Sequence, residues 1–224
     1  SYYAFSISRR AEQNQVWVGM SKETAHQLGT PTSSLLANLE LLRMKVDDQT
    51  VLEEVEKDIN RLEKITERFS KIGSQPDLTE ESLESVLSGV IAYIRSRSSR
   101  KVTYEMDFNQ QEDVVVAINR PLFEWVVENL LKNAIDSMNG EGKIRIGVRS
   151  KNKQVVVDVT DQGKGVSKSK QKAIFHPGYT TKKRGWGLGL SLARRIIEQY
   201  HGGRIFVHQS EPGRGTTMRI ILRR

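Results

Sequence analysis

Two asparagines and a lysine lie close together in segment 128–136, where they could handle a metal ion and phosphate groups. Asn129 and Asn133 are four residues apart, so on a helix their side chains share one face. Carboxamide oxygens can ligate Mg²⁺, a hard cation that bridges substrate phosphates. Lys132 could lean toward the same phosphates. An asparagine pair on a helix is more often an ordinary polar surface, so this pattern alone leaves both interpretations open.

A second chemical segment is Asp161-Gln-Gly-Lys-Gly165, which directly follows the strand-like run 155–160. A carboxylate at a strand end can accept a hydrogen bond from an amino group such as that of adenine. Gly163 and Gly165 would let the backbone turn close to a flat ring. An ordinary Asp-Gly turn has the same sequence, so either a base-binding turn or a plain turn fits.

A third segment, Gly-Trp-Gly-Leu-Gly at 185–189, opens a predicted helix that runs to residue 200. Glycines at a helix start expose backbone N–H groups at the positive end of the helix dipole, where a phosphate can bind. Gly187, Leu188 and Gly189 are the candidates for this role. The segment does not follow a strand within a βαβ unit of about 30 residues, which argues against a dinucleotide-binding fingerprint.

The elements that must position these segments form a mixed domain over residues 77–224. Apolar periodicity predicts helices at 80–96, 121–138 and 188–200, and strands at 102–106, 114–118, 143–148, 155–160, 204–208 and 216–222. Strands that are largely joined as hairpins and mixed with helices favour an α+β two-layer sandwich.

The region before it, residues 1–76, has a different pattern. Apolar residues recur at helical spacing over 8–45 and again over 52–72, with a polar break at 47–50. We expect an all-α helical hairpin, followed by a linker at 73–76. Two helices cannot enclose a core alone, so a second copy should complete a homodimeric four-helix bundle. Packing of the apolar stripe on the rest of the same chain is the alternative.

Composition excludes several function classes. The chain has no cysteine, which rules out disulfides and thiolate metal sites and favours a reducing, cytoplasmic location. The net charge of +8 comes from dispersed basic residues, so we expect no nucleic-acid partner. No apolar run approaches the ~20 residues that span a bilayer, so we expect no membrane contact within this chain. Because it begins at Ser1, we interpret it as part of a longer protein that could be anchored at the inner membrane.

The ordered segments resemble the conserved boxes of the GHKL ATPase superfamily over residues 77–224. The three described above match its N, G1 and G2 boxes, Ile174–Lys182 resembles its F box, and Gly213-Arg-Gly215-Thr216-Thr217 matches its final glycine motif. The N, G1, F and G2 boxes in the family's order are very unlikely to arise by coincidence. The resemblance implies a Bergerat-type fold that binds ATP and Mg²⁺.

The resemblance also assigns roles to residues. Asn133 would hold Mg²⁺, with Asn129 and Lys132 near the phosphates. Asp161 would bind the adenine amino group, with Gly163 and Gly165 beside the base. The remaining nucleotide neighbours implied by the boxes are Thr180, Thr181 and Lys182 in a lid over 167–186, the Gly187–Gly189 turn, and Thr216.

One position separates the branches of that superfamily. Its ATP-hydrolysing members carry a glutamate four residues before the metal-binding asparagine, and here that position is Asn129. Without a carboxylate base, attack by water should be slow, and the γ-phosphoryl group is kept for another acceptor. This favours a kinase over a DNA topology enzyme or a chaperone ATPase.

The expected acceptor lies in Ala25-His26-Gln27-Leu28-Gly29-Thr30-Pro31, which resembles the H box of the histidine kinase dimerisation domain. The resemblance implies a two-component sensor histidine kinase that phosphorylates His26 and then an aspartate on a response-regulator receiver domain. Thr30 matches the position that serves a phosphatase activity. Because Gln27 replaces the usual acid, an ATP-binding scaffold or a phosphatase is the main alternative, and a serine kinase of the same superfamily is the second.

We predict that changing Gln27 to Glu raises the initial rate of autophosphorylation. An amide can orient the His26 ring through a hydrogen bond, but it cannot take the ring proton at neutral pH, whereas a carboxylate can. Incorporation of radiolabelled γ-phosphate with Mg²⁺ measures the rate. An unchanged or lower rate in Gln27→Glu would contradict this role.

Overall fold

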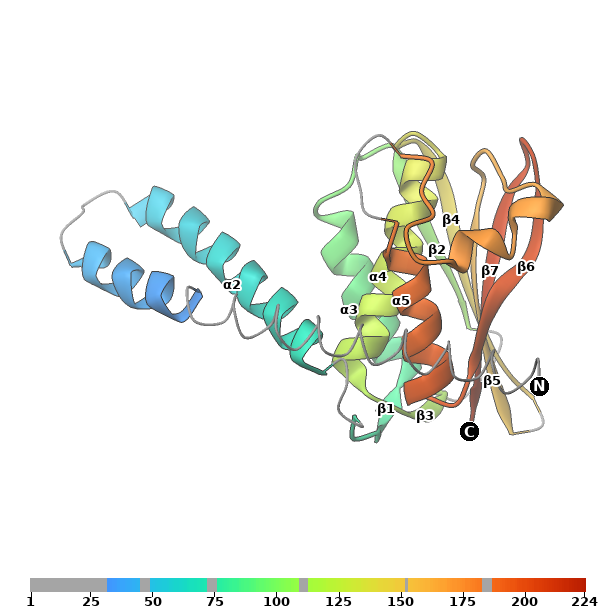
Figure 1. Ribbon diagram of the computed structural model, residues 1–224, viewed down its shortest axis with the longest axis horizontal. Helices are drawn as coiled ribbons and strands as arrows, with labels where there is room; N and C mark the ends of the chain where they lie inside the picture. The colour runs from blue at the N-terminus through green and yellow to red at the C-terminus, as the bar shows by residue number, and fades with distance from the viewer. Residues whose placement is uncertain (1–31, 45–48, 72–75, 109–112, 152, 183–186) are drawn as a thin grey trace, which may run out of the picture. The chain divides into compact units, whose positions relative to one another are not determined.

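The computed structural model describes residues 32–44, 49–71, 76–108, 113–151, 153–182 and 187–224 (Figure 1). The chain divides into two compact units, Ser1–Pro76 and Asp77–Arg224. Among the described residues, no helix has both the length and the apolar character that crossing a bilayer requires.

The described part of the first unit is helical over residues 32–43 and over α2, Gln49–Lys71. Leu39, Leu52 and Ile59 are buried and pack with the partly buried Leu36. An ion pair between Arg43 and Glu56 also joins the two helices. Other large apolar side chains of these helices remain exposed: Leu35, Leu41, Leu42, Met44, Val51, Val55 and Leu62. The described residues of this unit therefore bury only part of their apolar surface.

The second unit alternates helices and strands. In chain order these are β1 Thr79–Ser82, α3 Leu83–Arg95, β2 Val102–Phe108, β3 Val115–Ile118, α4 Arg120–Ser137, β4 Gly142–Lys151, β5 Gln154–Asp161, the short helices η1 Lys168–Lys170 and η2 Ala173–Phe175, α5 Gly189–Arg195 with its π-helical continuation η3 Ile196–Tyr200, β6 Arg204–Glu211 and β7 Gly215–Arg223.

The strands form one five-stranded sheet and one small pair. The order in the large sheet is β2-β4-β5-β7-β6, in which β2 and β4 are parallel and all other neighbours are antiparallel. β1 pairs with β3 in the separate sheet. Helices α3, α4 and α5 lie on one side of the large sheet (Figure 1). The α+β two-layer sandwich predicted from the sequence is thereby confirmed for this unit.

The core lies between this sheet and the helices. Alternate residues of the central strands are buried, because successive side chains of a strand point to opposite faces. They meet the apolar faces of α3 and α4. The buried residues that define this layer are Val86, Leu87, Val90, Leu122, Val126, Leu130, Ile144, Ile146, Val148, Val155, Val157, Val159 and Ile220. Burying each such side chain contributes about 1.5–3 kcal/mol, so the layer fixes where α4 lies on the sheet.

One element differs from the sequence prediction. Helix was expected from residue 80, but Thr79–Ser82 is a strand, and α3 begins at Leu83. Ser82 caps this helix, with its hydroxyl oxygen accepting a hydrogen bond from the Ser85 backbone N–H at 3.1 Å. The residues before the cap pair with β3, more than 30 residues later in the sequence. A local pattern cannot reveal that partner.

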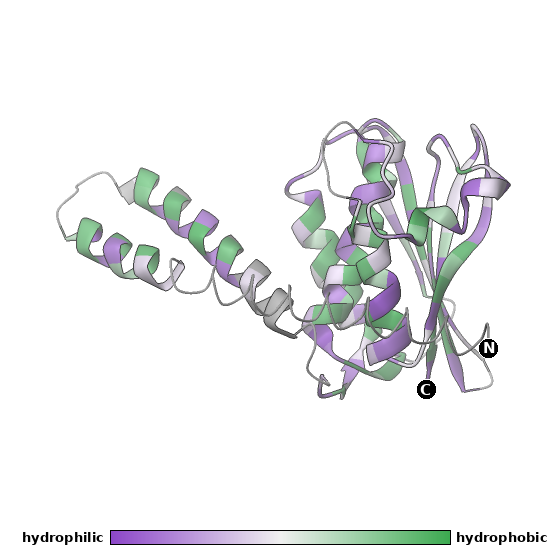
Figure 2. Cartoon of the chain, viewed as in Figure 1, coloured by the Kyte–Doolittle hydropathy of each residue, from purple (hydrophilic) through white to green (hydrophobic). Residues whose placement is uncertain are grey.

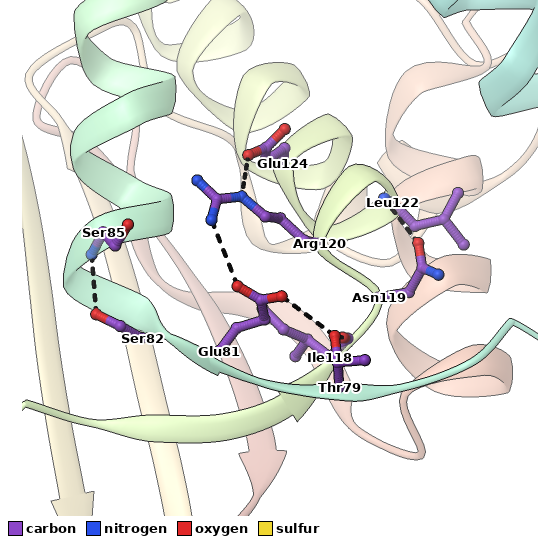
Figure 3. A network of polar contacts seen from close by, with 9 residues as sticks. All are labelled: Thr79, Glu81, Ser82, Ser85, Ile118, Asn119, Arg120, Leu122 and Glu124. Atoms are coloured by element: carbon purple, nitrogen blue, oxygen red, sulfur yellow. Dashed lines mark hydrogen bonds and ion pairs between the residues drawn. The ribbon is translucent and has the colours of Figure 1, made fainter.

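A polar network joins β1 to the start of α4 (Figure 3). The Arg120 guanidinium lies between Glu81 at 3.4 Å and Glu124 at 2.9 Å. Asn119 caps α4, because its Oδ1 accepts from the Leu122 N–H at 3.3 Å. Its Nδ2 donates to the Asp77 carbonyl at 3.1 Å. The first residues of the second unit are therefore bonded to the first turn of α4.

His201 holds the far end of η3 against the same turn. Its ring is buried, Nε2 accepts from the Asn119 backbone N–H at 3.1 Å, and Nδ1 lies 2.9 Å from the Ile196 carbonyl. These partners fit the neutral tautomer that carries its proton on Nδ1. Burial lowers the pKa of His201, since the charged ring would lose its hydration. Protonation at Nε2 would also direct a second N–H against that of Asn119.

We predict that His201 makes stability depend on pH. A lowered folded pKa means that the unfolded chain binds the proton more readily, so stability is full above about pH 6.5 and falls below it. Replacing His201 with Leu should cost about 1–3 kcal/mol at pH 7.5, because the Asn119 N–H loses its acceptor, whereas the Ile196 carbonyl keeps its hydrogen bond from the backbone N–H of residue 201. The same change should remove part of the pH dependence.

Urea unfolding followed by fluorescence between pH 5 and pH 8 measures both effects. His208→Leu is the control, because His208 is exposed on β6. It should keep the wild-type dependence. A His201→Leu variant with the wild-type stability and the wild-type pH profile would show that the buried ring has no such role.

Candidate functional site

The asparagine pair lies on α4, and Asn129 faces the start of α5. Asn129 is half-buried, and its Nδ2 is buried without a hydrogen-bond partner among the described residues. A Cβ placed on Gly189 would lie 3.1 Å from the Asn129 Oδ1. Glycine at 189 therefore lets α5 begin directly against Asn129. The N-box and G2-box residues predicted from the sequence are brought together here.

Lys132 forms an ion pair within α4. Its ammonium pairs with the Glu128 carboxylate at 3.3 Å, one helical turn earlier. The Glu128 side chain is 7% exposed, whereas that of Lys132 is 51% exposed. Lys132 thus compensates a buried charge on α4, and phosphate binding would require it to leave Glu128.

Asp161 ends β5 and is bonded to the last turn of α4. Its Oδ1 accepts from the Gly163 N–H at 2.8 Å and from the Ser137 hydroxyl at 2.9 Å. The residue is 7% exposed. Burial raises the pKa of Asp161, and the hydrogen bonds from Gly163, Ser137 and the Thr216 backbone offset this only in part. The carboxylate is a buried acceptor with defined orientation.

The turn after Asp161 depends on its glycines. A Cβ on Gly163 would lie 1.9 Å from the Ser137 hydroxyl, so no side chain fits. Gly165 has φ +69°, and a Cβ there would lie 2.0 Å from the Glu211 carbonyl oxygen. The intervening Lys164 donates its N–H to the Ser137 carbonyl at 3.1 Å. The turn is therefore packed tightly between α4 and the end of β6.

Thr216 approaches the same carboxylate from β7. It is the antiparallel partner of Asp161 in the sheet register and is buried. Its hydroxyl lies 2.8 Å from that of Ser210. Gly215, at φ +93°, packs so closely that a Cβ would lie 2.0 Å from the Asp161 carbonyl oxygen. The final glycine motif thus completes the wall around Asp161.

The predicted lid residues include one direct contact with α4. Lys182 is bonded to the Asn133 Oδ1 at 2.8 Å and to the Asp136 carboxylate at 2.6 Å. Thr180 and Thr181 are exposed. Gly187 accepts a hydrogen bond from the Gly178 N–H at 3.1 Å, so the chain before and after residues 183–186 comes together.

The structure therefore gathers most predicted nucleotide neighbours along the second half of α4. Direct contacts or the strand register join Asn129 to Gly189, Asn133 to Lys182, and Asp161 to Gly163 and Thr216. His26, Gln27 and Thr30 lie outside the described residues. Ser137 has no role in the motifs described above, although it follows Asn129 and Asn133 at steps of four residues and so lies along the same face.

The donor set suits Mg²⁺ bound together with phosphates. In the described ranges, no group of three or more His, Asp or Glu side chains could hold a metal by itself. The Asn133 oxygen already binds a cation, the Lys182 ammonium. Mg²⁺ keeps waters and takes few protein ligands when phosphates supply the others. Asn133 fits such a site.

Known proteins are similar to this chain in sequence and in fold. Residues 118–224 match the family described as histidine kinase-, DNA gyrase B- and HSP90-like ATPase. A similar curated protein is the signal transduction histidine-protein kinase AtoS of Escherichia coli strain K12, at 32% identity over 88% of this chain and 33% of AtoS. The chain spans between 29% and 51% of the length of the curated relatives that it matches.

Solved structures of the same kind are similar. A nucleotide-free catalytic domain of the histidine kinase ThkA matches with a TM-score of 0.60 and 30% identity, over 66% of this chain and 95% of that one. ThkA in complex with the response regulator protein TrrA matches in fold, with a TM-score of 0.62 and 23% identity over 99% of this chain and 66% of that one. The chain thus belongs to the sensor histidine kinases and carries their ATPase-like catalytic domain.

Proposed function

We propose that this chain transfers the γ-phosphoryl group of ATP to His26 and then to an aspartate of a response regulator. The observation that carries the proposal is the arrangement of Asn133, Asp161 and Thr216 around the second half of α4, in a domain of the histidine kinase family. The similarity to a kinase solved with a response regulator supports the second transfer.

Asp161 is the proposed acceptor for the adenine amino group. Its Oδ1 is held by Gly163 and Ser137, and the carboxylate keeps further lone pairs for a ligand donor. A hydrogen bond in this buried position is stronger than one in water. Only the ionised form is purely an acceptor, so base binding requires Asp161 to be deprotonated.

The phosphates are proposed to lie toward the other end of the same helix face. Asn133 would hold Mg²⁺, and the Gly187–Gly189 turn would offer backbone N–H groups. Asn129 borders that turn, and Lys132, Thr180, Thr181 and Lys182 are further candidates. When bound, Mg²⁺ neutralises the charge that develops on the transferred phosphoryl group. The chain itself positions the nucleotide.

The identity of residue 129 favours transfer over hydrolysis. Asn129 cannot take a proton from water, and its amide is buried against Gly189. A ring nitrogen of His26 would attack the γ-phosphorus, and the bond to the β-phosphate oxygen would break to release ADP. The ring must be neutral to attack and must lose one proton afterwards. Gln27 cannot take that proton, so solvent, a nucleotide oxygen or another carboxylate would.

We propose that the first unit forms a homodimeric four-helix bundle. The exposed apolar side chains include Leu35 and Leu42 on one helix and Val55 and Leu62 on α2. Figure 2 shows apolar residues along both helices. A second copy would bury this surface and complete the core. A cytoplasmic location is proposed with the function, since the substrate is ATP.

Phosphoryl transfer to His26 predicts a label with a defined chemistry. Incubation with γ-labelled ATP and Mg²⁺ should give a protein label that is stable in alkali and lost in acid. His26→Gln should abolish it, whereas His208→Gln, at an exposed histidine of β6, should retain it. An acid-stable label that persists without His26 would favour a serine kinase. Nucleotide binding without any label would favour an ATP-binding scaffold or a phosphatase.

Base recognition by Asp161 makes a second prediction. Asp161→Asn should weaken ADP binding by roughly 10- to 100-fold, corresponding to about 1.5–3 kcal/mol, because the amide presents donors to the adenine amino group. Burial raises the pKa of Asp161, so protonation begins at a higher pH than for an ordinary aspartate. As the pH decreases, the wild-type affinity for ADP should therefore begin to fall at that higher pH. The variant should lack that decline.

Isothermal titration calorimetry at several pH values measures both effects. Asp107→Asn on β2 is the matched control, because this aspartate is exposed. It should bind ADP as the wild type does. Equal affinity of the Asp161→Asn variant, with its fold intact by circular dichroism, would exclude Asp161 as the base acceptor.

A further inference from the structure

The ammonium of Lys182 occupies the oxygen that the proposed function assigns to the metal. It lies 2.8 Å from the Asn133 Oδ1 and 2.6 Å from the Asp136 Oδ2. Asn133 and Asp136 are three residues apart and share a face of α4. The ion pair is partly exposed, with side-chain exposures of 43% for Lys182 and 54% for Asp136. One lysine thus binds both oxygens.

The position of Lys182 is supported locally. Its backbone N–H donates to the Thr180 hydroxyl at 3.1 Å, which forms a tight turn just before the lysine side chain. In the part of the chain that the structure describes, no acidic cluster offers a metal an alternative protein site. The negative charge at this end of α4 is therefore compensated by a cation that belongs to the chain itself.

Lys182 and a metal ion cannot share Asn133 without strong repulsion. Mg²⁺ binds oxygen at about 2.1 Å. With the ammonium at 2.8 Å, two cations on one oxygen would lie within about 5 Å of each other. Like charges at that distance repel, so the two cations compete for the same oxygen. One cation must leave when the other arrives.

We propose that the Lys182 ammonium takes the place of Mg²⁺ on the Asn133 oxygen in the nucleotide-free protein. It must leave that oxygen when the nucleotide binds. This rests on the proposed function, because it takes Asn133 as the metal ligand. Metal-bound ATP brings both the competing cation and phosphate oxygens that receive the displaced ammonium. Without nucleotide, Lys182 stays on Asn133 and Asp136 and keeps free divalent cations out. The lysine thereby couples metal binding to nucleotide binding.

Removing the ammonium should let a free divalent cation reach Asn133. The probe is Mn²⁺ added to the full chain without nucleotide, and the readout is paramagnetic broadening of the Asn133 side-chain amide signals in NMR spectra. Lys182→Met keeps the apolar stem and removes the charge. The Mn²⁺ concentration for half-broadening should fall by roughly two- to fivefold, the range expected for losing a partly exposed ion pair.

Lys153→Met is the matched control, because it makes the same charge change in the exposed turn between β4 and β5, at the end of β5 opposite Asp161. It should leave the Mn²⁺ titration unchanged. Equal titrations of wild type and Lys182→Met would overturn the proposal, as would an equal gain in Lys153→Met, which would mean a net-charge effect.

A second measurement separates this proposal from the proposed function. In the presence of Mg²⁺, Lys182→Met should weaken ATP binding more than ADP binding, since the displaced ammonium would pair with the terminal phosphates. If none of the proteins binds nucleotide, the proposed function fails, while the Mn²⁺ titration still tests the exchange. If nucleotide binds normally and the Mn²⁺ titration does not change, the exchange fails and the function stands.

Discussion

The fold of the second unit depends on one joint, at which the end of β5 is bonded to the last turn of α4. Asp161 accepts hydrogen bonds from Ser137 and Gly163, and the turn beyond it has no room for a side chain at 163. The apolar layer holds α4 against the sheet. The polar joint fixes the rotation of α4 about its own axis and its position along the strands. The buried Asp161 carboxylate therefore sets the orientation of the α4 face that carries Asn133.

Part of this joint could be predicted from the sequence, because its chemistry is carried by short segments. Asn129, Asn133 and Asp161 could be identified by residue type and spacing, and the structure brings their segments together. The two-layer sandwich could likewise be predicted from apolar periodicity, because a buried strand face and a buried helix face leave different patterns. Local rules are sufficient where the signal lies within one element.

The rest depended on partners distant in the chain. Thr79–Ser82 is a strand because β3 lies beside it, and no local preference encodes that pairing. Lys132 pairs with Glu128, and Lys182 reaches Asn133, whereas the family resemblance placed both lysines near the nucleotide. Long charged side chains choose among several neighbours by small energy differences, which a sequence pattern does not contain. The His26 segment lies outside the described residues, so its role stays a prediction.

Asn119 has a mechanical consequence. Its side chain is bonded to the Asp77 carbonyl, its Oδ1 caps α4, and its backbone N–H is bonded to His201 at the end of η3. A pull on the chain at Asp77 would therefore act on the first turn of α4 and on the last turn of η3, as well as on β1, which begins two residues later. Both loaded helices lead, at their opposite ends, to the nucleotide segments. Asn119 therefore connects the start of the second unit mechanically to both helices.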